Sequence, residues 1–284
     1  MTSHKATVDD ARRLFAAMMA NASGWDDPRL ERAFESVPRE AFLPPGPWLI
    51  PRDRGRGTVL TPTADPIHLY QNVLVVLDAA EGLNTGEPEL HARLLGAARP
   101  QPGDAVTHIG AGAGYYTALL AMLVLPNGTV TAYEINGGLA KAAKHNLEPF
   151  EGVTVIEGNA VTLPIPPSDV IYVNAGVIAP PKQWLTALLP GGRLIFPWRP
   201  SERLGLAALV TRVATGFEFK PLLPCWFVGC VGASDAAPGD VIPNQAAARR
   251  TRSVRLTSDA PADASATAVF ADVWFSDEPP AGAP

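Results

Sequence analysis

Ile109-Gly110-Ala111-Gly112-Ala113-Gly114-Tyr115 stands where an apolar, β-branched run ends and a helix-like segment begins. Glycines at such a junction let the backbone turn tightly and approach a ligand closely. The first turn of the following helix adds unpaired N–H groups and a partial positive charge. The pattern therefore predicts a ligand-binding loop between a strand and a helix. The alternative is a simple turn of small residues.

Strand-like and helix-like segments alternate around this loop. Such alternation is the signature of a doubly wound, mainly parallel sheet with helices on both faces. The expected strands are 105–109, 129–134, 153–157, 169–174 and 193–197, and the expected helices are 115–125, 136–147 and 180–188. Continuous apolar runs, such as 170–173, fit strands that are buried on both faces. The sequence therefore predicts an α/β fold of the Rossmann-like kind.

The two ends of the chain have a different rhythm from the middle. Apolar residues recur at helical spacing over 8–20, a second helix is expected over 28–36, and the run 72–78 suggests a strand. Extended segments are expected at 204–213, 217–231, 253–257 and 268–275, with a helix at the end of 238–252 and a frayed tail over 276–284. We therefore expect one compact domain with three parts: an N-terminal helical region (1–100) packed on the core, a ligand-binding α/β core (101–200) and a β-rich extension (201–284).

The composition excludes several classes of protein. The 284 residues are 47% hydrophobic and 18% charged, which excludes a disordered chain. The formal net charge of -5 argues against a nucleic-acid partner, because such proteins normally carry a basic surface. No window approaches the roughly 18 apolar residues of a membrane span, and the polar start lacks the apolar core of a signal peptide. We expect a cytoplasmic protein without membrane contact.

Two cysteines, Cys225 and Cys230, lie in one apolar run. A structural metal site of the common four-ligand type needs a second pair of ligands, and neither another cysteine nor a nearby histidine supplies one. We therefore expect ordinary buried thiols and no metal site.

Two nucleotide ligands compete for the glycine loop. A dinucleotide fingerprint needs glycine at its first, third and sixth positions, and the sixth position here is Tyr115. Glycine at the alternate positions 110, 112 and 114 is instead typical of S-adenosylmethionine-dependent methyltransferases. Glu134 ends the next expected strand, where a carboxylate can accept hydrogen bonds from both ribose hydroxyls. Asn159 follows the third strand and is expected either at the adenine edge or in a simple turn.

Several segments together resemble the protein-L-isoaspartate O-methyltransferase family, whose members are class I S-adenosylmethionine-dependent methyltransferases. The segment Val37-Pro-Arg-Glu-Ala-Phe-Leu-Pro44 is the most family-specific match. The others are Gly110-Ala-Gly-Ala-Gly-Tyr-Tyr-Thr-Ala118, Glu134, Gly158-Asn159, Asp169-Val-Ile-Tyr-Val-Asn174 and Leu189-Pro-Gly-Gly-Arg-Leu-Ile-Phe-Pro197. The resemblance covers about residues 30–197, and Asn159 replaces the family's usual aspartate. It implies that S-adenosyl-L-methionine is bound by residues around the glycine loop: His108, Gly110, Ala111, Gly112, Gly114, Tyr115, Glu134, Asn159 and Ala160.

The substrate side departs from the family pattern. The family has a threonine-isoleucine-serine-x-proline segment, whose serine hydroxyl serves at the active site, where this chain has Asn84-Thr-Gly-Glu-Pro88. Gly86 stands in the place of that serine, so we expect Thr85 or Asn174 to supply the catalytic polar group at this position. His91 matches a histidine of some family members and is expected on the substrate side, or alternatively only near the start of a helix.

The expected acceptor follows from its chemistry. A carboxylate is already ionised at neutral pH, so its methylation needs alignment with the methyl group more than it needs a general base. No catalytic His–Asp pairing or metal-binding cluster is visible in the sequence. An amino-directed nucleic-acid methyltransferase would show Asn/Asp-Pro-Pro-aromatic after the fourth strand, whereas the chain reads Asn174-Ala-Gly-Val177. We expect an O-methyltransferase that acts on a carboxylate of a peptide, a protein or a small molecule. The alternative is a non-catalytic cofactor-binding or interaction protein on the same fold.

Overall fold

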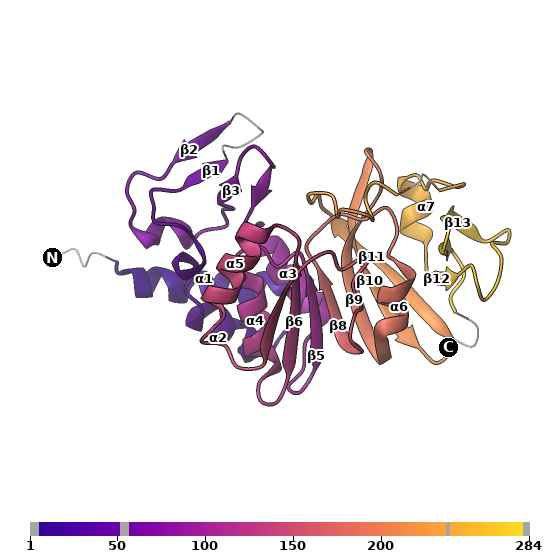
Figure 1. The fold of residues 1–284 in the computed structure, drawn as a ribbon, viewed down its shortest axis with the longest axis horizontal. Helices are drawn as coiled ribbons and strands as arrows, with labels where there is room; N and C mark the ends of the chain where they lie inside the picture. The colour runs from indigo at the N-terminus through magenta and orange to yellow at the C-terminus, as the bar shows by residue number, and fades with distance from the viewer. Residues whose placement is uncertain (1–5, 52–56, 237–238, 281–284) are drawn as a thin grey trace.

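Four adjacent parallel strands form one half of a ten-stranded sheet (Figure 1). They are β5 (Ala105–Ile109), β6 (Thr129–Glu134), β7 (Val153–Glu157) and β8 (Ser168–Val173), with α4 (Tyr115–Val124) and α5 (Gly137–Asn146) in the first two crossovers. In space they lie in the order β8-β5-β6-β7, so the winding reverses between β5 and β8. Open α/β sheets bind ligands outside the carboxyl ends of the strands at such a reversal. This edge is therefore the first place to look for a site.

The other half of the sheet is antiparallel and contains the C-terminal extension. After α6 (Lys182–Ala187) it comprises β9 (Leu188–Ser201), β10 (Leu204–Val213), β11 (Gly216–Pro224), β12 (Ser253–Leu256), β13 (Ala266–Val269) and β14 (Val273–Ser276), with α7 (Gln245–Arg250) between β11 and β12. The first of these, β9, pairs parallel with β8 and antiparallel with β10. The complete order is β13-β14-β12-β11-β10-β9-β8-β5-β6-β7, so the extension continues the same sheet.

The N-terminal segments pack beside the parallel strands (Figure 1). They comprise α1 (Val8–Ser23), α2 (Pro28–Ser36), η1 (Arg39–Phe42), β1 (Leu49–Pro51), β2 (Thr58–Leu60), η3 (Pro66–Leu69), β3 (Val76–Asp78), β4 (Leu83–Asn84) and α3 (Pro88–Ala98). Thr7 and Asp10 form a capping box that begins α1, and Gly24 ends it in the left-handed conformation. Asp27 caps α2, whose first residue is Pro28. Local sequence signals therefore account for both helices.

Two apolar clusters lie on opposite faces of the sheet. In β8, Val170 and Tyr172 belong to one cluster, while Ile171 and Val173 belong to the other. Successive side chains of a strand point to opposite faces, so this alternation places a core on each face. The first cluster includes buried residues of α1, α2, α3 and α4. The second includes α6 and the inner residues of the extension.

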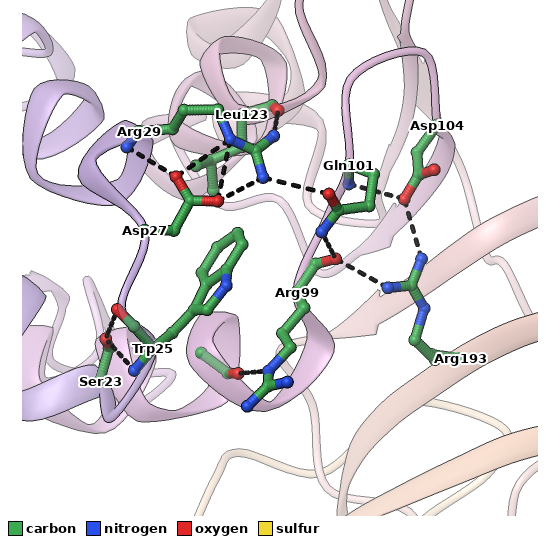
Figure 2. A network of polar contacts seen from close by, with 10 residues as sticks. Ser23, Trp25, Asp27, Arg29, Arg99, Gln101, Asp104, Leu123 and Arg193 are labelled. Carbon is green, nitrogen blue, oxygen red and sulfur yellow. Dashed lines mark hydrogen bonds and ion pairs between the residues drawn. The ribbon is translucent and has the colours of Figure 1, made fainter.

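A polar network connects the N-terminal helices with the sheet (Figure 2). Arg29 of α2 donates hydrogen bonds to the carbonyl oxygen of Leu123 at 2.9 Å and to the side-chain oxygen of Gln101 at 3.3 Å. The backbone N–H of Gln101 donates to the carboxylate of Asp104 at 2.9 Å, and Arg193 of β9 binds the same carboxylate at 2.9 Å. The network thus joins α2, the end of α4, the loop before β5 and the antiparallel half of the sheet.

The predicted α/β fold with an N-terminal helical addition and a β-rich extension is confirmed, and several element boundaries are corrected. The strands expected at 105–109, 129–134, 153–157 and 204–213 have these bounds in the structure. The strand expected at 72–78 is confined to β3, because Asn72 is turned toward α3 and accepts a hydrogen bond from the N–H of Glu89. The strand expected at 217–231 ends at Pro224, a residue that cannot donate a ladder hydrogen bond.

The end of the chain is more ordered than the sequence suggests. The single strand expected at 268–275 is two strands, β13 and β14, which pair with each other. The expected frayed tail begins later than residue 276, because Ser276 is buried in β14 and the hydroxyl of Ser253 donates to the carbonyl oxygen of Glu278 at 2.7 Å. The computed structural model describes residues 6–51, 57–236 and 239–280, so residues 281–284 of that tail lie outside the described residues. Among the helices that are described, none combines the length and apolar character needed to cross a membrane.

Candidate functional site

The glycine loop connects β5 to α4 at the edge where the winding reverses. Gly110, Gly112 and Gly114 have φ values of +77°, +57° and +101°, which side chains rarely adopt. A Cβ at Gly114 would lie 2.9 Å from Cδ1 of Leu147, so a larger residue there would also have to displace that side chain. A Cβ at Gly112 would meet no atom within 4 Å. The backbone at Gly112 therefore leaves open space in which a ligand can approach it.

Glu134, at the end of β6, is hydrogen-bonded to this loop. Its side chain accepts hydrogen bonds from the N–H of Gly112 at 2.7 Å and from the N–H of Asn136 at 2.9 Å. The residue is only 7% exposed. Each carboxylate oxygen keeps a second acceptor position, so the same group can also bind ligand hydroxyls. The predicted ribose position is compatible with this geometry and stays a prediction.

His108 and Asn174 form a hydrogen-bonded chain behind the loop. The Asn174 amide nitrogen donates to Nε2 of His108 at 2.8 Å, so Nδ1 of His108 carries the proton and donates to the hydroxyl of Thr117 at 2.8 Å. Burial lowers the pKa of His108 to about 3, which keeps the ring neutral. The amide oxygen of Asn174 is buried and has no hydrogen-bond partner among the described residues. A buried acceptor of this kind is normally paired with an N–H or O–H donor, which a bound ligand or an ordered water can supply.

A cavity of about 400 Å³ adjoins the glycine loop. Its walls come from distant parts of the chain. They include the loop at 110–113 with the start of α4, the segment 84–87 with the start of α3, residues of 39–43 and 74–77, Asn174, and the segment 223–228 of the extension. Of the predicted site residues, the cavity is lined by Gly110, Ala111, Gly112, Tyr115, Thr85, Gly86, His91 and Asn174. The structure thus brings the predicted cofactor side and the predicted substrate side into one space.

The remaining predicted cofactor residues do not line the cavity. Glu134 holds Gly112 of the loop through a hydrogen bond, His108 precedes the loop in β5, and Gly114 ends it at the start of α4. Asn159 accepts a hydrogen bond from the N–H of Val161 at 2.9 Å and donates to the carbonyl oxygen of Val231 at 3.1 Å. Its side chain therefore shapes a turn and ties that turn to the extension, which corresponds to the simpler of its two predicted roles. Ala160 is buried beside it, and its carbonyl oxygen accepts from Trp184 at 3.0 Å.

The substrate-side residues are arranged differently from the expectation for Thr85. Its hydroxyl accepts from the N–H of Val75 at 2.9 Å and donates to the carbonyl oxygen of Gly86 at 3.3 Å. The hydroxyl is therefore engaged with the backbone. Gly86 has a φ of +75°, and a Cβ there would overlap Nε2 of His91. His91 itself is 1% exposed, and burial lowers its pKa well below the ordinary 6.5.

Sequence reasoning missed several residues that shape the cavity. Arg39, in the segment 37–44, is 3% exposed and donates to the carbonyl oxygens of Leu69, Gln71 and Val73. It thereby holds the connector that leads to the substrate-side loop. Trp226 and its neighbours in the extension also line the cavity, although they lie more than a hundred residues from the glycine loop. The family-like segment 37–44 could have indicated that Arg39 belongs to the site. No motif near Trp226 indicates that it lies beside the glycine loop.

No group of three or more histidine, cysteine, aspartate or glutamate side chains in the described part of the chain could hold a metal ion. Cys225 and Cys230 are free thiols, and burial raises the pKa of each to about 12. Neither thiol is therefore poised as a nucleophile at neutral pH.

Comparisons with known proteins agree with the geometry. The family model described as protein-L-isoaspartate(D-aspartate) O-methyltransferase matches residues 64–248. A protein-L-isoaspartate O-methyltransferase 1 of Geotalea uraniireducens is 30% identical over 79% of this chain and 94% of its own length. A protein-L-isoaspartate O-methyltransferase of Aeropyrum pernix is 34% identical over 60% of this chain, and the match spans only 59% of that relative.

Two solved structures share the fold. A protein-L-isoaspartate O-methyltransferase has a TM-score of 0.66 at 22% identity, covering 93% of this chain and 86% of that one. A putative enzyme of the same name from Plasmodium falciparum, in complex with S-adenosyl-L-homocysteine, has a TM-score of 0.61 at 18% identity, covering 77% and 97%. At identities of 22% and 18%, these two structures establish only that the fold is shared. The family model and the Geotalea relative establish membership of the family. The chain belongs to the protein-L-isoaspartate O-methyltransferase family of S-adenosylmethionine-dependent methyltransferases.

Proposed function

We propose that this protein transfers the methyl group of S-adenosylmethionine to a carboxylate of a peptide, a protein or a small acid. The observation that carries the proposal is the shared cavity, which is lined both by the glycine loop and by the segment 84–87 with His91. A methyl donor on one side and an acceptor on the other would meet there. Aligning two reactants in one enclosed space is the main contribution a protein makes to such a displacement.

The residues present fit the cofactor. Gly112 leaves open space beside its backbone, and Glu134 keeps acceptor positions for the two ribose hydroxyls. The buried amide oxygen of Asn174 lacks a donor among the described residues, and an α-ammonium group would supply one. When bound, S-adenosylmethionine supplies an electrophilic methyl group on a positively charged sulfur. The chain's own residues would orient it within the cavity.

The character of the cavity favours a carboxylate acceptor. Its buried histidine, His91, is neutral because burial lowers its pKa, and within the described residues no carboxylate pairs with it to make it a strong base, although Glu87 and Glu89 also line the cavity. A hydroxyl acceptor would need such a base, whereas a carboxylate is ionised at neutral pH without one. The acceptor then needs only positioning. This reasoning applies equally to an isoaspartyl side chain and to a small acid.

The test uses the full-length protein with methyl-labelled S-adenosylmethionine. The acceptors are an isoaspartyl peptide, the same peptide with ordinary aspartate, and succinate as a small acid. We expect base-labile label in at least one acceptor, as a methyl ester requires. Binding of S-adenosylhomocysteine is measured in parallel by calorimetry. Bound S-adenosylhomocysteine without any base-labile label would remove the carboxylate as acceptor, and absent binding would remove the cofactor assignment.

One observation favours a second candidate, a non-catalytic cofactor-binding protein on the same fold. Gly86 has no hydroxyl, and the neighbouring hydroxyl of Thr85 is bound to the backbone. This candidate predicts S-adenosylhomocysteine binding with no labelled product from a protein extract. Any cofactor-dependent methyl transfer by the purified protein would eliminate it.

A further inference from the structure

Gly86 and His91 occupy one space between them. A Cβ at Gly86 would overlap Nε2 of His91 and lie 2.8 Å from its Cδ2. Real Cβ atoms essentially never approach that closely, so any side chain at position 86 would have to displace the imidazole. The φ of +75° at Gly86 also favours glycine. The edge of the His91 ring therefore stands where a side chain of residue 86 would begin.

The ring of His91 is held in this position by its neighbours. It stacks on Tyr116 with ring centroids 3.6 Å apart and an interplanar angle of 15°. Phe227 of the extension meets it edge-on at 5.7 Å and 74°. Its Nδ1 lies 2.9 Å from the hydroxyl of Tyr172, and the whole residue is 1% exposed. These contacts leave the ring no freedom to turn Nε2 away from the cavity that it lines.

The contact with Tyr172 determines which nitrogen carries the proton. The Tyr172 hydroxyl is fully buried, and Nδ1 of His91 is its hydrogen-bond partner within the described residues. If Nδ1 donated to the phenol oxygen, the phenol proton would be a buried donor without an acceptor, which costs about 1–3 kcal/mol. If the phenol donates to Nδ1, the donor without a protein partner is instead the Nε2–H of His91, a residue that lines the cavity, where water or a ligand can accept from it. The proton of the neutral imidazole then sits on Nε2, which has no partner among residues 6–51, 57–236 and 239–280.

We propose that the Nε2–H of His91 donates a hydrogen bond to the acceptor carboxylate, and so takes over the place of the side-chain hydroxyl that Gly86 lacks. This inference rests on the proposed function, because it assumes that the acceptor is a carboxylate. His91 lines the same cavity as Asn174 and the glycine loop, and its Nε2 is the ring atom nearest to Gly86, another lining residue, so an acceptor bound there would face the cofactor side. Tyr172 acts as a positioning residue that fixes the tautomer.

The first test reads the proton directly and does not depend on turnover. Nitrogen-15 NMR of the full-length protein with labelled histidine distinguishes Nε2–H from Nδ1–H, and the His91→Phe variant identifies the His91 signals by their loss. We expect the proton on Nε2, and we expect the Tyr172→Phe variant to give a mixture of tautomers. A proton on Nδ1 in the wild-type protein would overturn the proposal, whatever the acceptor turns out to be.

The second test compares transfer to the carboxylate acceptor that the wild-type protein uses. His91→Phe keeps an aromatic ring for stacking but has no N–H, so we expect kcat/KM to fall about tenfold to a hundredfold with unchanged affinity for S-adenosylhomocysteine. His91→Gln restores a donor and should recover a large part of that loss. Full activity of His91→Phe would refute the role of His91. Absence of transfer by the wild-type protein itself would count against the proposed function instead, and the position of the proton would still decide the inference.

A pair of variants at both positions provides the control. Gly86→Ser alone should lower transfer, because its Cβ collides with the imidazole. Gly86→Ser combined with His91→Ala opens room for the hydroxyl and should transfer faster than either single variant. A gain of activity in Gly86→Ser alone would show that the two positions do not share one function.

Discussion

Glu134 offers the sharpest test of the cofactor site, through the change Glu134→Gln. The carboxylate accepts from the N–H of Gly112 at 2.7 Å and from that of Asn136 at 2.9 Å, and the residue is 7% exposed. A glutamine has one acceptor oxygen, so one of these two N–H groups would face an NH₂ group instead. A hydrogen bond to a charged group is worth about 1.5–3 kcal/mol. In the free protein the loop can relax toward water, whereas the bound loop must keep its shape, so most of this loss should appear in binding.

We therefore expect the affinity for S-adenosylhomocysteine to fall by about tenfold to a hundredfold in Glu134→Gln, measured by isothermal titration calorimetry. Glu157→Gln is the matched control, because Glu157 ends the neighbouring strand β7 with a side chain that is 53% exposed. Its affinity should equal that of the wild type. Urea denaturation of both variants separates loss of binding from loss of folding. An unchanged affinity in Glu134→Gln would refute the reasoning that this carboxylate shapes the cofactor loop.

Three further predictions concern stability and the acceptor. Arg193→Met should lower the free energy of unfolding by about 2–4 kcal/mol in urea titrations. The reason is that the carboxylate of Asp104, which is 14% exposed, loses its ion-pair partner. A loss below about 0.5 kcal/mol would contradict this prediction. Trp226→Ala should change the free energy of unfolding by less than about 1 kcal/mol, since Trp226 is 55% exposed. It should raise the KM of the acceptor several-fold, because Trp226 lines the cavity. An unchanged KM would place the acceptor elsewhere. The hydrogen bond from Arg29 lowers the pKa of Asp27 below 3.8, so the stabilisation is present above that pH and is lost as the pH falls through the lowered pKa. Asp27→Asn should therefore destabilise the protein at pH 7 but not near pH 2, and equal destabilisation at both would contradict the assignment.

The parallel half of the sheet could be predicted from the sequence because its signals are local. Each strand is a short apolar run rich in β-branched residues, and helical segments follow β5, β6 and β8. The signal for the glycine loop is also local. Residues 110, 112 and 114 all have positive φ angles, and such angles favour glycine at those positions. For the same reason Glu134 could be placed at a strand end next to the loop. Local periodicity and local backbone strain therefore account for the cofactor side.

The acceptor side could not be predicted in the same way, because its walls come from distant segments. Phe227 meets His91 through the packing of the extension against α3, and no periodicity in either segment indicates that contact. The carbonyl oxygens that Arg39 binds belong to a connector some thirty residues further along the chain. The end of β11 at Pro224 was missed because the apolar run continues to residue 231, although its later part forms cavity wall instead of strand. Apolar character signals burial but does not reveal which surface is covered.

The pair Gly86 and His91 shows why a missing residue is a poor guide to a missing function. Taken alone, Gly86 is a position where the family's hydroxyl has been lost, and the sequence offers Thr85 as the nearest substitute. In the structure, the Thr85 hydroxyl is hydrogen-bonded to the backbone. The imidazole of His91 occupies the position where a side chain of residue 86 would begin. In this structure a serine side chain at position 86 would have to displace the imidazole, so a test of the hydroxyl must change both positions together. A polar group at the acceptor position is then retained with a different chemistry, since a neutral imidazole fixed by Tyr172 presents a single N–H donor where a hydroxyl can rotate and both donate and accept.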